Sequence, residues 1–258
     1  MKDLCRKIYW LVSIQLGVDV RRMMYSLMGI PRFLKDWYQF KSTYHGSLNI
    51  RPCLSDWYEE GGATKDEYFL QDLSVARKIY QATPLKHVDI GSRIDGFVAH
   101  IASFRDIEVF DIRPITSSIP GVIFKQADLM TQSNELIDYC DSISCLHALE
   151  HFGLGRYGDP INAYGYESGL SNISKILKKE GFLYLSIPIG KEKVEFNAHR
   201  IFNPISFVRL ALSSNLSLIE FSWIDSDNNL NQSSNPKQDM EKLSDINYAL
   251  GIFTFIKK

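Results

Sequence analysis

From residue 65 onwards, short runs of β-branched and aromatic residues alternate with longer stretches whose apolar residues recur three and four positions apart. The short runs predict buried strands and the longer stretches predict amphipathic helices. We expect strands at 86–90, 107–112, 122–129, 141–146, 182–188, 216–224 and 250–258, and helices at 65–81, 95–104, 168–181 and around 204–214. Such short connections favour right-handed crossovers. The pattern therefore predicts a doubly wound α/β fold with a mostly parallel, seven-stranded sheet covered on both faces.

Two regions depart from this alternation. Residues 1–64 have a helical pattern, in which Gly29 to Pro31 is expected to end one helix and start another, and they predict an N-terminal helical cap or arm. The α/β domain is then expected at 65–258. Within it, residues 225–245 are polar and rich in asparagine, which predicts a mobile loop.

Composition and charge narrow the classes of function. With 258 residues, 45% of them hydrophobic and 23% charged, the chain has the profile of a soluble globular protein. The formal net charge of -1 gives no overall field that would attract nucleic acid, so we expect no nucleic-acid partner. The four cysteines, Cys5, Cys53, Cys140 and Cys145, form no C-x-x-C pair, which favours a reducing cytoplasm.

The N-terminal arm differs in charge from the rest of the chain. Residues 1–41 carry eight Lys and Arg side chains against three Asp, and aromatic residues follow them. The apolar run from Ile8 is too short to span a bilayer, and no small-residue cleavage site follows it. Three interpretations remain open: a cap packed on the main domain, a dimerisation element that makes a homodimer, and peripheral contact with the inner face of the membrane.

Candidate chemistry collects where the expected strands end, because ligands of open parallel sheets bind at the carboxyl ends of the strands. Asp89 ends the first strand and Gly91 begins the turn after it, where the missing Cβ lets the backbone approach a ligand closely. Asp111 ends the second strand twenty residues later, the spacing at which a carboxylate reaches the ribose of a nucleotide-like cofactor.

The turn itself discriminates between cofactors. A dinucleotide site would need G-x-G-x-x-G, whereas this turn has only Gly91 and Gly96, with Ser92, Arg93 and Asp95 among the residues between them. A carboxylate at Asp95 would repel phosphate and suit the cationic amine and sulfonium of S-adenosylmethionine. The positive charge of Arg93 argues weakly for a phosphate-containing cofactor instead, so an NAD-dependent enzyme stays as an alternative.

The order of these features resembles the class I S-adenosylmethionine-dependent methyltransferases over about residues 84–258. The resemblance rests on the Asp-x-Gly turn, the acidic end of the second strand, "ADL" after the third strand, "CLHALEH" after the fourth, and "ISKILKKEGFLYLSIP". More narrowly, "HVDIGSRIDGFVAHIASF", "CLHALEHFGLGRYGDP" and "FNAHRIF" are similar to a little-characterised bacterial family of methyltransferase-like proteins, described as a domain of unknown function.

This resemblance implies a Rossmann-like methyltransferase fold with S-adenosylmethionine as its cofactor. It places Asp89 and Gly91 at the start of the cofactor loop and Asp111 at the ribose. It also places Asp128 and Leu129 beside the adenine, and Leu146 and His147 along the cofactor. The chain departs from the usual D-x-G-x-G-x-G, because Arg93 and Asp95 occupy the second and third glycine positions and Gly96 comes one place late.

After the fourth strand, His147, Glu150 and His151 spell H-x-x-E-H, the order of one class of zinc peptidases. A strand precedes them and three glycines with a proline follow, so the long helix that two metal-binding histidines need is not expected. We expect no metal and keep a zinc hydrolase as an alternative. A structural histidine is a second alternative at either position.

A catalytic interpretation fits better. If the methyl acceptor is a hydroxyl, a histidine near its ordinary pKa can remove the proton. His151, oriented by Glu150 or another carboxylate, is the first candidate for this base, and His199 is the second. His147 is a further catalytic candidate, because either His147 or His151 could face the methyl acceptor.

The loop after His151 suggests the acceptor. Tyr157 and Tyr164 beside Asp159 suit a sugar ring, whose CH edges pack on aromatic faces, and Arg200 could hold an anionic group. The hypothesis is therefore a cytoplasmic methyltransferase that methylates oxygen on a small polar acceptor, such as a saccharide or nucleotide-sugar in surface polysaccharide biosynthesis. Its main rival is a binding or scaffold protein that kept the fold without the chemistry.

Overall fold

A computed structural model of the chain describes residues 9, 11–62, 64, 66–131 and 134–258. The chain separates into two compact units, Met1–Ala63 and Thr64–Lys258. Parts of three predictions lie outside the described residues: the first eight residues of the basic arm, Cys5, and Lys65 at the expected start of the α/β domain. The described cysteines, Cys53, Cys140 and Cys145, are free thiols.

The second unit is built on one mixed sheet with the strand order β3-β2-β1-β4-β5-β10-β8-β9. Its strands are β1 (His87–Ile90), β2 (Ile107–Asp111), β3 (Val122–Gln126), β4 (Cys140–Leu146), β5 (Leu177–Ile189), β8 (Leu216–Ile224), β9 (Leu230–Gln232) and β10 (Ala249–Lys257). The first five are parallel, and β10 pairs antiparallel with both β5 and β8. The predicted α/β fold is confirmed, and β9 adds an eighth strand to the seven expected.

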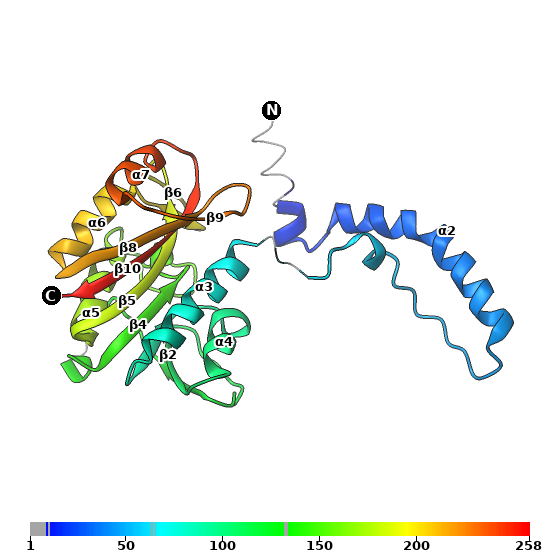
Figure 1. Cartoon of the computed structure of the whole chain (residues 1–258), viewed down its shortest axis with the longest axis horizontal. Coiled ribbons are helices and arrows are strands. Elements are labelled where there is room, and N and C mark those ends of the chain that lie inside the picture. Colours follow the sequence, from blue (N-terminus) through cyan, green and yellow to red (C-terminus); the bar gives the residue numbers. More distant parts are fainter. Residues whose placement is uncertain (1–8, 10, 63, 65, 132–133) are drawn as a thin grey trace. The chain divides into compact units, whose positions relative to one another are not determined.

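Helices cover both faces of this sheet (Figure 1). On one face, α3 (Glu67–Ala82) and α4 (Ala99–Ala102) contribute Val75, Ile79 and Ile101 to a core that also contains residues of β2, β4, β5, β8 and β10. On the other, α5 (Gly165–Ile176), α6 (Pro204–Ser213) and α7 (Pro236–Leu243) bury Ile173 and Phe207 among their core residues. Residues 177–181, expected to end a helix, belong instead to β5.

The polar segment 225–245 is not a structureless loop, so that prediction is wrong. It contains β9 and α7. Its polar side chains make local bonds: the Asp225 carboxylate accepts hydrogen bonds from the backbone nitrogens of Asp227 and Asn229, and Asn235 caps α7 by accepting from Gln238 N. Short polar residues that bond to the backbone stabilise turns and helix starts, which composition alone cannot distinguish from disorder.

The first unit contains a π-helical turn (Leu11–Gln15), the long helix α2 (Val20–Thr43) and a 3₁₀ turn (Asp56–Tyr58). The expected break at Gly29 to Pro31 does not occur, and α2 continues through Pro31. Asp19 caps α2 by accepting a hydrogen bond from Arg22 N. Within the described part of the chain, no helix has the length and apolar character required to cross a membrane.

A small hairpin positions the residues after β5. It pairs β6 (Lys193–Glu195) with β7 (His199–Ile201) in antiparallel register. A parallel bridge between Ile189 and Phe202 joins the end of β7 to the end of β5. His199 and Arg200 therefore lie beside the carboxyl end of the sheet.

Candidate active site

A pocket of about 520 Å³ opens at the carboxyl ends of the parallel strands β1 to β4. Every one of these four strand ends contributes to its wall, through Gly91, Asp111, Asp128 and His147. The rest of the wall is largely apolar and includes Phe110, Ile112, Ala127, Leu129, Met130, Ala148 and Phe152. Apolar walls with a few convergent polar groups are typical of small-molecule sites.

The pocket brings together only part of the residues singled out from the sequence. Those that line it are Gly91, Asp111, Asp128, Leu129, His147, His151, Tyr157 and Asp159. Those that lie outside its wall are Asp89, Ser92, Arg93, Asp95, Gly96, Leu146, Glu150, Tyr164, His199 and Arg200.

Asp89 and Ser92 are buried and tie β1 to β4. The Asp89 carboxylate accepts hydrogen bonds from Ser92 N (3.0 Å), Ser92 Oγ (2.6 Å) and Ser144 Oγ (2.6 Å). Ser92 Oγ in turn accepts from Leu146 N at 3.1 Å, and Leu146 itself is buried. Burial raises the pKa of Asp89 to about 6, although these donors act to lower it. These residues hold the floor of the site and have no free polar group to offer a ligand.

The remaining residues of the β1 turn satisfy one another. Arg93 donates two hydrogen bonds to Asp95, at 3.2 and 3.0 Å, and both side chains are exposed. Because the pair is neutral overall, the argument from an isolated negative charge at Asp95 does not hold. A Cβ at Gly96 would lie 2.6 Å from Asp72 Oδ2, so this glycine lets the turn pack against α3.

Gly91 is the one residue of the turn that faces the pocket. It has a positive φ of 69°, and a Cβ there would lie 2.9 Å from the Cβ of Ala148. A side chain at this position would therefore be both strained and crowded. The backbone of Gly91 therefore forms this part of the pocket wall without a side chain.

Asp111, at the end of β2, is held by an arginine that the sequence argument missed. Arg113 donates to Asp111 through Nε (3.1 Å) and Nη2 (2.7 Å), and its backbone nitrogen donates at 2.8 Å. The guanidinium also lies 4.4 Å from the ring centre of Tyr157. The signal was present in "DIRP", where a cation stands two residues after the acid.

Asp128, after β3, partly stabilises its own turn. Its Oδ1 accepts a hydrogen bond from Met130 N at 2.9 Å, while its neighbour Leu129 is buried in the wall. The carboxylate is half-buried and lines the pocket, so it can still meet a ligand.

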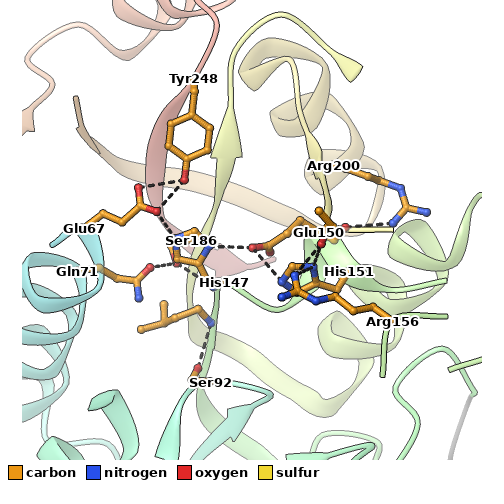
Figure 2. A network of polar contacts seen from close by, with 12 residues as sticks. Glu67, Gln71, Ser92, His147, Glu150, His151, Arg156, Ser186, Arg200 and Tyr248 are labelled. Atoms are coloured by element: carbon orange, nitrogen blue, oxygen red, sulfur yellow. Dashed lines mark hydrogen bonds and ion pairs between the residues drawn. The ribbon is translucent and has the colours of Figure 1, made fainter. Parts of the chain in front are cut away.

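At the β4 end, a buried carboxylate lies between two histidines (Figure 2). The Glu150 side chain is fully buried, and its Oε1 accepts a hydrogen bond from His147 Nδ1 at 2.8 Å and lies 3.7 Å from His151 Nε2. Glu150 Oε2 is buried without a hydrogen-bond partner. His147 has a positive φ of 52°, which turns its side chain back toward Glu150. Glu150 does not itself line the pocket, but both histidines beside it do, and an unsatisfied buried polar atom of this kind is unusual in folded proteins.

His147 is enclosed by groups that no local pattern connects to it. Its Nε2 lies 3.6 Å from Glu67 Oε1 and has no hydrogen-bond partner. Tyr248, which is distant in the sequence, donates to Glu67 at 2.8 Å, and Tyr68 packs its ring 4.5 Å from the imidazole (Figure 2). Glu67 and Tyr68 lie at the start of α3, and Tyr248 directly precedes β10. Only the folded chain therefore brings these residues to His147.

The backbone of His147 is anchored as well. Its nitrogen donates to the backbone oxygen and the Oγ of Ser186, at 3.1 and 3.2 Å. Ser186 Oγ also donates a short hydrogen bond to Gln71 on α3. The position of the imidazole is therefore fixed from α3, β4 and β5 together.

His151 is oriented in the opposite sense. Its Nδ1 donates a hydrogen bond to the backbone oxygen of Ala198 at 2.7 Å, which leaves Nε2 as the nitrogen with a free lone pair. Burial, the largest effect, lowers the pKa of His151 below its ordinary value, although the charge of Glu150 acts to raise it. This histidine is a base in its neutral form.

The pKa values of the two histidines are shifted in opposite directions. Burial acts to lower the pKa of His147 too, but the hydrogen bond and charge of Glu150, with the charge of Glu67, outweigh burial and raise it. The same contact holds the pKa of Glu150 below its usual range in spite of burial. His147 is therefore the more readily protonated of the two histidines and is held by Glu150 at 2.8 Å, which makes it a poorer candidate for the base than His151.

The loop after His151 is held by two polar residues that were expected to bind substrate. The Asp159 carboxylate accepts hydrogen bonds from the backbone nitrogens of Gly153, Gly155 and Tyr157. Arg200, which is 5% exposed, donates to backbone oxygens, among them Phe152 O at 2.6 Å. Its guanidinium also reaches the oxygens of Glu150, Asn162 and Ala163. The structure therefore gives Arg200 a structural position in place of the substrate contact predicted for it.

Two further candidates lie away from the pocket wall. Tyr164 is exposed at the start of α5, and His199, on β7, has its ring centre 6.4 Å from that of Tyr248. Burial lowers the pKa of His199. Neither residue lies where Gly91, Asp111 and His151 converge.

The H-x-x-E-H order does not form the helical platform of a zinc peptidase. His147 precedes a single 3₁₀ turn, Leu149–His151, and both of its ring nitrogens face carboxylates. Among the described residues, no group of three or more His, Cys, Asp or Glu side chains is arranged to hold a metal ion.

Known proteins share the fold. The 1,6-didemethyltoxoflavin-N1-methyltransferase of Burkholderia thailandensis, solved with S-adenosylhomocysteine, is 12% identical, with a TM-score of 0.53 over 92% of this chain and 90% of that one. The cyclase SpnF is 14% identical, with a TM-score of 0.52 over 74% and 81%. CalS10, an amino pentose methyltransferase from Micromonospora echinaspora, is 12% identical, with a TM-score of 0.50 over 83% and 100%. At these identities the likeness establishes the fold.

At the level of sequence, one family model matches residues 107–251, more than half of the chain. Its description reads "Caenorhabditis protein of unknown function, DUF268". This agrees with the expected family of unknown function, while the bacterial origin stays a prediction. No curated protein matches the sequence.

Proposed function

The chain belongs to the family of proteins of unknown function DUF268, and from the geometry of its pocket we propose that it is an S-adenosylmethionine-dependent methyltransferase. The acceptor in this proposal is an oxygen of a small polar molecule such as a saccharide or nucleotide-sugar. The observation that carries the proposal is the convergence of Gly91, Asp111 and His151 on one pocket at the ends of four parallel strands.

The residues in this pocket fit the proposed cofactor. The Gly91 backbone leaves open the space that a Cβ would fill, and Asp111 at the end of β2 offers carboxylate oxygens for ribose hydroxyls. Phe110 and Leu129 supply apolar surface for an adenine ring, with Asp128 beside them. Bound S-adenosylmethionine would supply an activated methyl group.

The chain's own contribution would be to position the acceptor and remove its proton. His151 Nε2 carries the lone pair that can take a proton from an acceptor hydroxyl, because Nδ1–H is held by Ala198. The imidazolium formed would then lie 3.7 Å from the Glu150 carboxylate, which stabilises the charge. The apolar walls exclude water, which strengthens these electrostatic interactions.

Support for a saccharide acceptor is narrower. Tyr157 presents an aromatic ring at the pocket, and CalS10, which shares the fold, acts on an amino pentose. The Tyr157 ring also lies beside Arg113 and Arg156, so a sugar would have to share it with a guanidinium. A role in surface polysaccharide biosynthesis is the corresponding pathway-level proposal.

Calorimetry tests the cofactor. We expect S-adenosylmethionine and S-adenosylhomocysteine to bind and NAD not to bind. Gly91→Ala should abolish adenosyl-ligand binding, since its Cβ would be strained and would crowd Ala148. Gly61→Ala is the matched control, because a Cβ there meets no atom within 4 Å. Absence of adenosyl-ligand binding at millimolar concentration in the unaltered chain would contradict the proposal.

Turnover with labelled cofactor and a panel of acceptors tests the base. His151→Ala should lower kcat by about 10²-fold or more while leaving cofactor affinity nearly unchanged, and the exposed His100→Ala should change neither. Full turnover in His151→Ala would transfer the role to His199 or to no base.

One observation favours the alternative of a binding module without catalysis. Arg113 donates a side-chain hydrogen bond to each carboxylate oxygen of Asp111, so a ribose would have to share this carboxylate with the chain's own side chain. SpnF, a cyclase by name, shows that this fold is not restricted to methyltransferases. If neither the unaltered chain nor Arg113→Ala binds an adenosyl ligand, this alternative is the better one.

A further inference from the structure

The long helix of the N-terminal unit has an uncovered apolar side. At 3.6 residues per turn, one side of α2 collects Val20, Met23, Met24, Leu27, Ile30, Leu34 and Tyr38, which we call the apolar stripe. All of its side chains are exposed, from 39% at Ile30 to 67% at Leu27. Contiguous exposed apolar surface of this kind marks an interaction site.

The other side of α2 already has a partner within the same unit. Residues 44–58 run back along the helix (Figure 1). Gly29 is buried against the backbone of Leu54, where a Cβ would lie 2.1 Å from the carbonyl oxygen. Arg32 lies 3.1 Å from the ring centre of Trp57. Packing within the unit therefore uses the side opposite the stripe and leaves the stripe itself unpartnered there.

The charges on α2 indicate what covers the stripe. The helix carries Arg21, Arg22, Arg32, Lys35 and Lys41 against the single acid Asp36. On the helical wheel, Lys35 lies at one edge of the stripe, and Lys41 lies in line with the stripe, beyond its last residue Tyr38. Their long apolar stems can lie along the stripe while the ammonium groups reach outward. An apolar face bordered by Lys and Arg is typical of helices that lie on an anionic lipid surface.

We propose that α2 docks flat on an anionic membrane surface, with the apolar stripe in the boundary between head groups and acyl chains. Two copies packed stripe to stripe in parallel would instead bring the two Lys41 ammonium groups, which lie in line with the stripe, close together, and like-charge repulsion disfavours this. This inference is independent of the proposed function, because it uses no residue of the pocket.

Sedimentation of the full chain with vesicles tests the inference. We expect binding to phosphatidylcholine vesicles that contain about 30 mol% phosphatidylglycerol, weaker binding to phosphatidylcholine alone, and a loss of the difference at high salt. The double variant Leu27→Gln and Leu34→Gln should lower partitioning at least tenfold for both vesicle types. Lys35→Gln with Lys41→Gln should lower it by about fivefold per charge for the anionic vesicles alone.

Matched controls keep the outcome decisive. Leu85→Gln with Leu212→Gln removes two exposed leucines from the other unit, 90% and 62% exposed against 67% and 45% for Leu27 and Leu34, and should leave partitioning unchanged. Circular dichroism reports whether α2 keeps its helicity, and the lysine pair decides the question if the leucine pair does not. Absence of vesicle binding by the unaltered chain would overturn the inference. So would a dimer, seen by sedimentation velocity, that the leucine pair converts to monomer without any change in vesicle binding.

Discussion

The turns after β1 and β4 begin alike and end differently. Each follows a buried parallel strand and each has a positive φ, at Gly91 and at His147. In the β1 turn, polar side chains satisfy one another: Asp89 with Ser92 and Ser144, and Arg93 with Asp95. In the β4 turn, Glu150 Oε2 and His147 Nε2 are buried without hydrogen-bond partners.

The difference indicates which of the two turns has polar groups that the fold itself does not pair. Because nearly all buried polar groups in folded proteins are paired, a paired group such as Asp89 is accounted for by the fold itself. An unpaired buried group costs stability, so its presence at a pocket indicates a requirement other than folding. We therefore expect the β1 turn to have a structural role and the β4 turn to supply the groups that take part in the reaction. Substitutions at Glu150, at Asp89 and in the Arg93–Asp95 pair test this difference, and their expected effects on stability decrease in that order.

Glu150→Ala should have the largest effect on stability. It removes from the buried His147 the nearest carboxylate, which raises the pKa of that histidine, and breaking a buried ion pair costs about 3–5 kcal/mol. Urea unfolding at pH 7 measures the loss, and NMR should show the pKa of His147 falling. The exposed Glu241→Ala should stay within about 0.5 kcal/mol of the unaltered chain. Equal losses for the two variants would mean that the ion pair does not exist.

Asp89→Ala should cost less, about 2 kcal/mol, although Asp89 is equally buried and better bonded. The reason is that burial raises the pKa of Asp89 to about 6, so its ionised form is held at a cost at pH 7. The exposed Asp106→Ala is the control.

The pH dependence of Asp89 has a definite sign. Between an unfolded pKa near 3.8 and a folded pKa of about 6, the folded state binds more protons than the unfolded state, so this group's contribution to stability falls as pH rises through that window. Asp89→Asn should remove this slope, and its stability deficit should therefore be larger at pH 4 than at pH 7. A deficit that grows with pH would contradict the raised pKa.

Much of the fold was predictable from the sequence because the strands from His87 to Lys257 are short buried runs with strong β-branched character. The positions after these strands were predictable for the same reason, and Gly91, Asp111, Asp128 and His147 do meet in one pocket. The roles of individual side chains were less accessible. They depend on partners such as Glu67 and Tyr248, 181 residues apart, which no local period relates.

A second limit on prediction from the sequence concerns residues whose side chains can serve either a substrate or the backbone. Arg200 and Asp159 have the charges that a substrate site needs, yet four backbone oxygens and three backbone nitrogens occupy them. The three glycines in "FGLGRYGDP" make a loop that cannot form a helix, so its backbone groups need side-chain partners. From the sequence one could predict that these backbone groups need side-chain partners, but not which side chains would bond to them.

The smallest effect is expected at the Arg93–Asp95 pair, and it tests the comparison from the other side. The side chains are 52% and 76% exposed, so solvent screens their attraction, and exposed ion pairs of this kind contribute about 0.2–1 kcal/mol. A double-mutant cycle with Arg93→Gln and Asp95→Asn, measured by urea unfolding at low and high salt, should give a coupling within that range that shrinks as salt is added. A coupling above about 2 kcal/mol that salt does not change would mean that the pair is desolvated. The β1 turn would then contain a desolvated charged pair, as the β4 turn does. The proposed difference between a structural β1 turn and a reactive β4 turn would no longer be supported.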